Sequence, residues 1–335
     1  MISHTSLQWQ SSDWQSILQT AIRDSQELLH AVGVKPESVA AIGNEASGFP
    51  VLAPRPFVSR MEYGNALDPL LLQVLALAQE LDPNALGTTD PLEEQQFTPV
   101  PGVIHKYFGR ALLMTTGACA INCRYCFRRH NDYAQNILTP ARLTAALDYL
   151  HKQTEITEII LSGGDPLLTS DRKLSELLAQ LEAIPHIKRL RIHTRLPIVI
   201  PQRVTPELCH PLGQSRLQVT VVVHCNHPRE IDSDVGAAMA QLKAKGITLL
   251  NQSVLLKNIN DSAATLETLS TELFKIGVLP YYLHTLDLVQ GAAHFAHPLA
   301  ESKRLHQLLQ ARLPGYLVPK LVSEIPGSAS KTLIY

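Results

Sequence analysis

Between residues 111 and 290 the sequence alternates short β-rich apolar runs with segments of helical periodicity. The six runs are ALLMT, ITEIILSGG, IKRLRIHT, LQVTVVVHCN, GITLLNQSVLL and GVLPYYLHTLD, and segments such as LTAALDYLHKQ and RKLSELLAQLEAI lie between them. The helical segments carry apolar residues at i, i+3 and i+4, whereas the runs are rich in β-branched residues. A repeating strand–helix unit requires a parallel sheet, because each connection crosses over one face of the sheet. The sequence therefore predicts an α/β fold whose sheet is open or closed into a barrel.

This pattern divides the chain into three parts. Residues 1–95 contain two stretches of helical spacing, 14–32 and 68–82, separated by a segment with Gly and Pro, which predicts an N-terminal helical extension. We expect the α/β core over 96–290 and a short C-terminal cap over 291–335. The N-terminus lacks a basic segment followed by an apolar run, and the longest apolar stretches are too short to span a bilayer. We therefore expect a cytoplasmic protein with no membrane span.

The composition favours small molecules as partners. With 45% hydrophobic and 18% charged residues, the 335-residue chain has the balance of an ordinary globular protein. Its formal net charge of -1 argues against a dedicated nucleic-acid binder, which usually carries a basic stripe that neutralises phosphates.

Three of the five cysteines stand within eight residues of each other in CAINCRYC, at Cys119, Cys123 and Cys126. They are too close together to form a disulfide framework, and they follow the first β-rich run, at the sheet edge where parallel α/β proteins bind ligands. The spacing C-x3-C-x2-C suits three irons of an iron–sulfur cube whose fourth iron has no protein ligand. The alternative is a structural zinc site completed by His130 or Cys209.

Other polar groups end the later runs. The segment SGGDP follows the second run, although Gly-Gly before Asp-Pro is also a common turn. His224 and Gln252 end the fourth and fifth runs and would line the same mouth. The stretch His224–His227 is alternatively a satisfied polar turn or a metal-binding pair. Lys331 follows the small residues PGSAS, and a lysine so close to a terminus is usually solvated.

The cysteine spacing and its place after a first strand resemble the radical S-adenosylmethionine (radical SAM) superfamily. In that superfamily three cysteines hold a [4Fe–4S] cluster, S-adenosylmethionine chelates the fourth iron, and an external one-electron reductant starts radical chemistry. The resemblance implies a partial (β/α)6 barrel with the cluster on the three cysteines. The implied S-adenosylmethionine contacts are Ser162, Gly163, Gly164, Asp165, His224 and Gln252.

Longer stretches are similar to lysine 2,3-aminomutases over essentially residues 60–335. They are CRYCFRRH, SGGDPL, LPIVIPQRVT, LLNQSVLLKNIND and PYYLHTLDLVQGAAHF. In that family a lysine after a small-residue turn forms a Schiff base with pyridoxal 5′-phosphate, which implies this role for Lys331. The stretch HKYFGR implies phosphate contacts from Lys106, Tyr107 and Arg110, with lysine at a position where the family has arginine.

The same resemblance implies the substrate contacts. Arg128 matches the residue that grips the α-carboxylate of free L-lysine, and Asp287 and Glu324 match two acids that hold its ε-ammonium. Two converging carboxylates repel each other unless a cation lies between them, so a diamino acid is a reasonable substrate. Glu324 stands where stand-alone aminomutases have aspartate. We expect the neighbouring Arg129 to be a solvated surface residue.

Several stretches are closer still to the branch of this family that prepares β-lysine, expected in the R form, for elongation factor P. They are PLEEQ, VPGVIHKYFGRALL, AIPHIKRLRIH and GYLVPKL. The resemblance implies a functional link to elongation factor P and its lysyl ligase. The sequence ends four residues after Lys331, without the longer tail of stand-alone aminomutases. The alternatives are a stand-alone catabolic aminomutase, an iron–sulfur electron carrier and a radical enzyme that modifies RNA.

Overall fold

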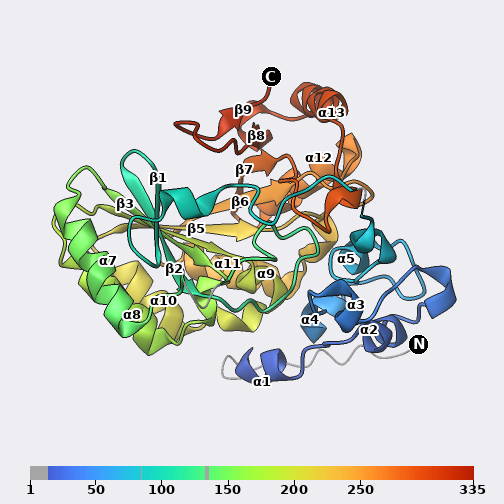
Figure 1. Ribbon diagram of the computed structural model, residues 1–335, viewed down its shortest axis with the longest axis horizontal. Coiled ribbons are helices and arrows are strands. Elements are labelled where there is room, and N and C mark those ends of the chain that lie inside the picture. The colour runs from blue at the N-terminus through green and yellow to red at the C-terminus, as the bar shows by residue number, and fades with distance from the viewer. Residues whose placement is uncertain (1–13, 84, 133–135) are drawn as a thin grey trace.

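A sheet of nine strands, in the order β1 to β9, forms the centre of the computed structural model, which describes residues 14–83, 85–132 and 136–335 (Figure 1). The first 13 residues lie outside this range, and so does the prediction made from them that the N-terminus carries no targeting segment. The strands are β1 Val103–Tyr107, β2 Arg110–Thr116, β3 Glu158–Gly163, β4 Arg189–Thr194, β5 Gln218–His224, β6 Thr248–Val254, β7 Leu279–His284, β8 Lys320–Ser323 and β9 Thr332–Leu333. Strands β2 to β8 are parallel, whereas β1 and β9 run antiparallel to their neighbours β2 and β8.

A helix follows each of the strands β2 to β7. These helices are α7 Pro140–Lys152, α8 Asp171–Glu182, α10 Pro206–Gln214, α11 Ser233–Lys243, α12 Ala263–Lys275 and α13 Leu299–Arg312. The six strand–helix units confirm the predicted (β/α)6 pattern. Among the described strands, β1 and β9 end the sheet without pairing with each other, so the barrel is partial, as expected. No helix of the described residues is long and apolar enough to cross a bilayer.

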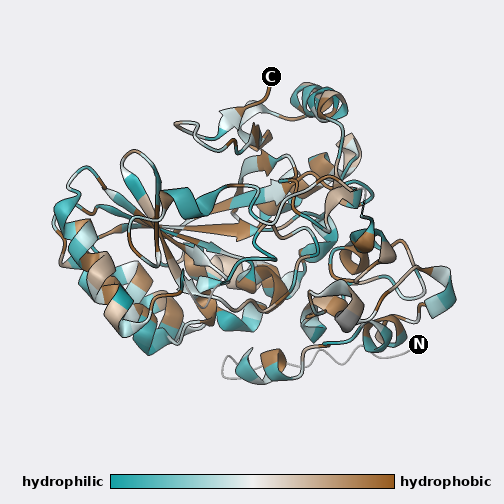
Figure 2. Cartoon of the chain, viewed as in Figure 1, coloured by the Kyte–Doolittle hydropathy of each residue, from teal (hydrophilic) through white to brown (hydrophobic). Residues whose placement is uncertain are grey.

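Local sequence explains where these helices begin and which side they bury. The side chains of Thr139, Thr205 and Asp232 accept hydrogen bonds from the first backbone N–H groups of α7, α10 and α11. Helix α8 buries Leu174 and Leu178, which lie four residues apart on one face. Figure 2 shows apolar residues along the strands and on the helix surfaces that cover them, with polar residues outside.

The N-terminal helices are shorter than the sequence predicts. The first stretch splits into α1 Trp14–Gln19 and α2 Ser25–Ala31, because Ile22 pairs with Ala53 and Asp24 caps α2. In the second stretch only α5 Pro69–Leu72 and η3 Ala78–Leu81 are helical. The remaining short helices are η2 Pro36–Ser38, α3 Asn44–Ser47, α4 Arg55–Val58, η4 Glu94–Phe97, η5 Pro166–Leu168, α9 Leu196–Val199, η6 Pro201–Arg203, η7 Pro228–Glu230, η8 Ala293–Phe295 and η9 Gly315–Leu317.

The N-terminal segment and the sheet share one hydrophobic core, which runs from Trp14 to Phe295. Polar contacts add to this packing, because the Arg60 guanidinium donates to the carbonyl oxygens of Ile198, at 2.8 Å, and of Glu230, at 2.5 Å. The predicted domain bounds stay a prediction, but the shared core fixes the N-terminal segment against the barrel.

A second, smaller core holds the C-terminal cap in place. It contains Leu283 of β7, Leu266 of α12, Leu305 and Leu309 of α13, and Leu321 of β8. Because β8 extends the parallel sheet and β9 returns beside it, the residues that link them lie at the same edge as the ends of β2 to β7.

Candidate active site

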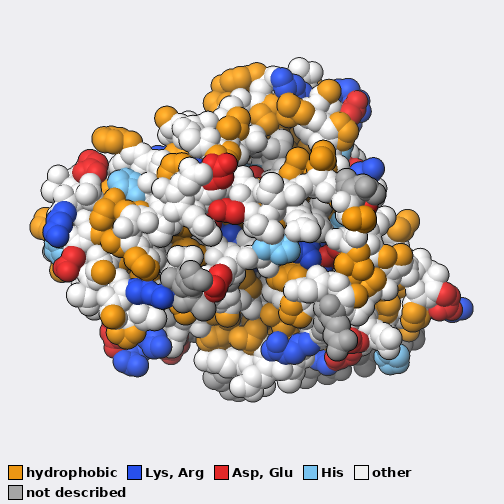
Figure 3. All heavy atoms as spheres, viewed as in Figure 1, with side chains coloured by type: hydrophobic (Ala, Val, Ile, Leu, Met, Phe, Trp, Pro, Cys, Tyr) orange, Lys and Arg blue, Asp and Glu red, His pale blue; other side chains and the backbone are white. Residues whose placement is uncertain are grey.

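The carboxyl ends of the parallel strands bring most of the predicted site residues to one mouth of the barrel. These are the cysteine loop after β2, Ser162–Asp165 at the end of β3, His224 and Gln252 near the ends of β5 and β6, Asp287 after β7, and Glu324 after β8. Lys331 directly precedes β9. In the space-filling view, acidic, basic and histidine side chains meet near the middle of the visible face (Figure 3).

The glycine turn after β3 supports the cysteine loop through its backbone. The N–H groups of Gly164 and Asp165 donate to the carbonyl oxygens of Thr116, at 2.7 Å, and Ala118, at 2.8 Å. A Cβ atom on Gly164 would stand 2.1 Å from the Ala118 carbonyl oxygen, which is far closer than real contacts allow. Glycine is therefore required here because the two loops touch.

The Asp165 carboxylate is fully engaged within the protein. It accepts hydrogen bonds from Thr194 Oγ1 at 2.6 Å and from the backbone N–H groups of Leu167, Arg195 and Leu196. Burial raises the pKa of this carboxyl, and these four donors oppose that effect. Asp165 therefore joins the glycine turn to the end of β4, and its side chain has little capacity left for a ligand.

Two buried arginines hold the other side of the cysteine loop. Arg124 and Arg129 both bond to the Glu80 carboxylate, at 2.5 and 2.6 Å, and both lie over the Phe49 ring. The expectation that Arg129 is solvated is wrong, because its ion pair with Glu80 is buried. The N-terminal segment, which supplies Glu80 and Phe49, thus fixes the loop that carries the cysteines.

The three loop cysteines present half-buried thiols that affect one another. Burial raises the pKa of Cys126 to about 11, with a further contribution from Cys123, and burial also raises the pKa of Cys119, helped by Cys126. Arg195 Nη1 lies 2.7 Å from the Cys123 sulfur and offers it a hydrogen bond. Neighbouring thiolates repel each other, so a cationic metal centre is the partner that would stabilise all three.

The zinc alternative has no completed ligand set. Cys209 is buried in α10, within the helical layer, and His130 Nε2 is bonded to the Gln290 carbonyl oxygen. Across residues 14–83, 85–132 and 136–335, no three His, Cys, Asp or Glu side chains, the loop cysteines included, lie close enough together to hold a single metal ion. The thiolates that hold a four-iron cluster bind separate irons and therefore lie farther apart.

His224 is a neutral residue inside a polar network. Its ring stacks on Tyr125, and Nε2 lies 3.0 Å from the Tyr125 hydroxyl. Burial, helped by the charge of Arg195, lowers the pKa of His224 well below its ordinary value. Gln252 is its register partner on β6. His227 instead caps η7 by accepting a hydrogen bond from the Arg229 N–H.

Glu324 binds two lysines of the chain itself. Its carboxylate lies 2.5 Å from Lys331 Nζ and 3.0 Å from Lys106 Nζ, and Lys106 also donates to the Leu92 carbonyl oxygen at 3.2 Å. Burial alone would raise the pKa of Glu324, but the two ammonium groups outweigh burial and lower it to about 2. Glu324 is therefore ionised at any working pH.

Asp287 lies in the same charged group without a hydrogen-bond donor among the described residues. Burial raises the pKa of this carboxyl to about 7, and Glu324 adds to the effect while Lys331 and Lys106 oppose it. A carboxyl of this kind gains most from an added cation.

Tyr107 connects the predicted phosphate residues. Arg110 stacks 4.7 Å from its ring centroid, and Lys106 Nζ lies 5.9 Å away. The buried Tyr107 hydroxyl forms no hydrogen bond of ordinary geometry among the described residues, although burial and the nearby Glu324 carboxylate raise its pKa. None of the described carboxylates forms an ion pair with Arg110. A donor hydroxyl beside an unneutralised guanidinium fits an anionic group such as a phosphate.

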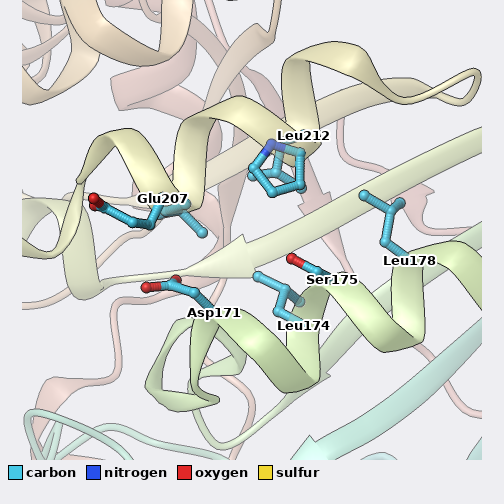
Figure 4. Close-up of a pocket in the computed structure, with 8 residues that line it drawn as sticks. Asp171, Leu174, Ser175, Leu178, Glu207 and Leu212 are labelled. Atoms are coloured by element: carbon cyan, nitrogen blue, oxygen red, sulfur yellow. The ribbon is translucent and has the colours of Figure 1, made fainter.

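Arg128 is paired with a carboxylate that sequence reasoning did not single out. Its Nε and Nη2 atoms contact the two carboxylate oxygens of Glu94 at 2.7 and 2.6 Å, and Nη1 donates to Ser162 Oγ at 3.2 Å. Arg195 was also missed, although it directly follows β4 and the rule that ligands gather at strand ends would have found it. Figure 4 shows a separate shallow pocket between α8 and α10, which none of these residues lines.

Comparisons with known proteins agree with this geometry. Residues 113–269 match the radical SAM superfamily. The chain is 48% identical over 324 residues to an L-lysine 2,3-aminomutase of Haemophilus influenzae, which covers 97% of this chain and 96% of that protein. It is 50% identical over 321 residues to the protein of the same name from Escherichia coli, covering 96% and 94% of the two chains. The chain belongs to the L-lysine 2,3-aminomutase family. A further member, from Clostridium subterminale, is 34% identical over 322 residues, covering 96% of this chain and 77% of that one.

This aminomutase family member is an isomerase that uses a [4Fe–4S] cluster, S-adenosylmethionine and pyridoxal phosphate. The donor chemistry of the chain fits these groups, with Arg110 at the start of β2, at the opposite end of that strand from the cysteine loop. Three thiols share one loop, Lys331 supplies a primary amine, and Arg110 with Tyr107 supplies donors for a phosphate.

Proposed function

We propose that this enzyme converts free L-lysine into β-lysine, and that the (R)-β-lysine formed serves the modification of elongation factor P. The observation that carries the proposal is the charge arrangement at the mouth, which binds one ammonium group and one carboxylate. In the ligand-free protein both come from the chain, since Lys331 pairs with Glu324 and Glu94 pairs with Arg128. A free diamino acid offers an ammonium and a carboxylate on one molecule, so it would satisfy both positions.

Arg128 is the residue proposed to hold the substrate α-carboxylate. A guanidinium presents its N–H groups in a planar fork that matches a carboxylate, so it fixes orientation as well as position. The contact with Ser162 links this arginine to the turn proposed to hold S-adenosylmethionine. A substrate held by Arg128 would therefore lie next to that cofactor, where a small misplacement of C3 lowers turnover.

Asp287 and Glu324 are the residues proposed to hold the ε-ammonium. In the enzyme that carries pyridoxal phosphate, the Lys331 nitrogen no longer serves as an ammonium group for Glu324. Glu324 then keeps Lys106 but loses its 2.5 Å partner, and Asp287 still lacks a donor among the described residues. The substrate ammonium would compensate both carboxylates at once.

The remaining roles concern the cofactors. When bound, the cluster and S-adenosylmethionine supply the means of removing hydrogen from an unactivated carbon, and pyridoxal phosphate supplies a π-system beside the migrating nitrogen. Cys119, Cys123 and Cys126 would ligate the cluster, and Lys331 would hold pyridoxal phosphate. Its phosphate would bind Arg110 and Tyr107, with Lys106 supporting Glu324.

Contacts to S-adenosylmethionine would come from the turn after β3 together with His224 and Gln252. The N–H groups of Gly164 and Asp165 are used by the cysteine loop, so the turn would offer carbonyl oxygens, which suit the cofactor's ammonium group. Neutral His224 can serve as donor or acceptor without adding charge beside that cation.

The link to elongation factor P rests on sequence. The stretches PLEEQ, VPGVIHKYFGRALL and GYLVPKL resemble the branch that serves this factor. A cytoplasmic enzyme with an external one-electron reductant is part of the proposal, and five free thiols fit a reducing compartment.

Anaerobic reconstitution followed by incubation with L-lysine and a reductant tests the proposal. Chiral chromatography should detect (R)-β-lysine, and the product should be accepted by the lysyl ligase of elongation factor P. Formation of the S isomer alone would refute the proposed link to elongation factor P. Absence of any β-lysine would refute the proposed reaction.

A further inference from the structure

Glu94 forms a bidentate ion pair with Arg128 at the mouth of the barrel. Both of its carboxylate oxygens contact Arg128, at 2.6 and 2.7 Å, and the two side chains are only 13% and 8% exposed. This is the side-on bidentate geometry in which arginine binds a carboxylate most strongly. Glu94 thus presents to Arg128 the same chemical group that the proposed substrate would present.

The segment that carries Glu94 is attached to the mouth through the residues before Glu94, whereas the residues just after it form only local hydrogen bonds in the described part of the chain. Thr88 pairs with the loop after β7, through Leu288 and Gln290, and the Leu92 carbonyl accepts from Lys106. Beyond these anchors, η4 is a single turn whose other hydrogen bonds among the described residues are local, such as that from Thr98 Oγ1 to the Glu94 carbonyl oxygen. Glu94 can therefore leave Arg128 without breaking a strand or a long helix.

Charge also opposes the presence of two carboxylates at this position. Asp287 and Glu324 already line the same mouth, and a bound substrate carboxylate would add a third negative group beside Glu94. Arg128 would remain compensated if the substrate carboxylate replaced Glu94, whereas Glu94 would regain water at the surface. Exchange of one carboxylate for another avoids the uncompensated buried charge that makes ordinary ion-pair breakage so unfavourable.

We propose that Glu94 occupies the substrate-carboxylate position on Arg128 in the ligand-free enzyme and competes with lysine for it. This inference rests on the proposed function, because it assumes that Arg128 receives the α-carboxylate of the substrate. If Glu94 holds Arg128 in most molecules, the apparent affinity for lysine is the intrinsic affinity multiplied by the fraction of molecules in which Arg128 is available. Removing the competing charge should therefore tighten lysine binding, by about tenfold if nine molecules in ten are closed.

The test compares Glu94→Gln with the matched control Glu93→Gln in the reconstituted holoenzyme. Glu93 is exposed one residue away and bonds to Gln96, so its substitution removes the same charge from the same segment without touching Arg128. Lysine affinity is measured by anaerobic calorimetry without reductant, so that no turnover occurs. A second ligand, L-lysine amide, lacks the carboxylate.

Glu94→Gln should bind lysine about tenfold more tightly while its affinity for the amide stays unchanged, and Glu93→Gln should match the wild type for both ligands. Lysine should also speed hydrogen exchange at the amides of residues 94–98 in the wild type. Weaker lysine binding by Glu94→Gln would overturn the inference and make Glu94 a residue that positions Arg128. An equal gain in affinity for both ligands, or in both variants, would overturn the inference, because it would show a general effect of charge and no competition at Arg128.

The substitution Arg128→Gln separates this inference from the proposed function. It should weaken lysine binding and leave the amide unaffected. If Arg128→Gln leaves lysine binding unchanged, the proposed substrate contact is wrong. If it weakens lysine binding but Glu94→Gln does not tighten it, only the competition is wrong.

Discussion

Asp287→Asn should stabilise the protein in the absence of cofactors and substrate, and more so at alkaline pH. The folded structure raises the pKa of Asp287 from 3.8 to about 7, chiefly by burial. The folded protein therefore holds this proton more tightly than the unfolded chain does. Its stability falls as pH rises from about 4 to about 7, and above that range this carboxyl contributes no further change.

The size of the effect follows from the two pKa values. The interval between 3.8 and about 7 corresponds to roughly 4 kcal/mol at 1.4 kcal/mol per pH unit. Asparagine resembles the protonated acid and carries no charge, so the variant should be more stable by roughly 4 kcal/mol at pH 8 and by roughly 2 kcal/mol at pH 5.

Urea unfolding followed by circular dichroism at the two pH values measures this difference. Asp148→Asn, on the exposed face of α7, removes one acid elsewhere and serves as the control. A gain of the same size at pH 5 and pH 8, or no gain at all, would refute the assignment of a strained carboxylate at position 287. The stabilised variant should bind lysine more weakly, because asparagine lacks the negative charge proposed to hold the ε-ammonium group. A gain in stability at the expense of function is common at binding sites.

Further substitutions test the cofactor sites. Replacing all three loop cysteines with alanine should abolish iron and sulfide retention after anaerobic reconstitution, whereas replacing Cys209, buried in α10, and Cys225, buried after β5, should leave iron content unchanged. Lys331→Ala should remove the lysine that borohydride fixes to pyridoxal phosphate, and peptide mapping that finds the label on another lysine would contradict the assignment. Gly164→Ala should lower iron retention severalfold, because its Cβ would meet the Ala118 carbonyl oxygen at 2.1 Å, and normal iron binding would show that the loops separate easily.

The strand–helix alternation made the central fold predictable from sequence. Each of the six predicted runs became one of the strands β2 to β7, because buried parallel strands require near-continuous apolar runs. Strands β1, β8 and β9 were not predicted. They are short, and β8 and β9 depend on pairing with distant segments instead of on a local pattern.

The N-terminal segment shows how tertiary contacts override helical spacing. Residues 68–82 carry the apolar pattern of a helix, but Leu70, Leu71 and Leu75 are all buried, so the segment is enclosed on several sides. Between α5 and η3 the backbone is paired with the segment around Ala41, since Leu77 pairs with Ala41 and the Ala78 N–H donates to the Ala40 carbonyl oxygen, and this pairing interrupts the helix. Packing against the barrel therefore decides this conformation, and helix propensity does not.

The candidate site was predictable where residues follow strands and unpredictable where they come from the N-terminal segment. The loop cysteines and the glycine turn have recognisable spacing at strand ends. Glu80 and Glu94 have no such signal, because each reaches the site through chain folding that brings residues 80–94 across to the region after β2. The error for Arg129 has the same origin, since its partner is Glu80.

Recognition of free lysine through both of its ends can be tested by a labelling experiment. The reconstituted enzyme is given ¹³C-labelled free L-lysine together with unlabelled elongation factor P, and β-lysine is followed by NMR and mass spectrometry. A lysine within a polypeptide has its α-amine and carboxyl in amides, so it lacks the groups that Lys331 and Arg128 are proposed to engage. We expect ¹³C-labelled free β-lysine and no rearranged residue within elongation factor P. Rearrangement confined to unlabelled lysine in elongation factor P would contradict this expectation.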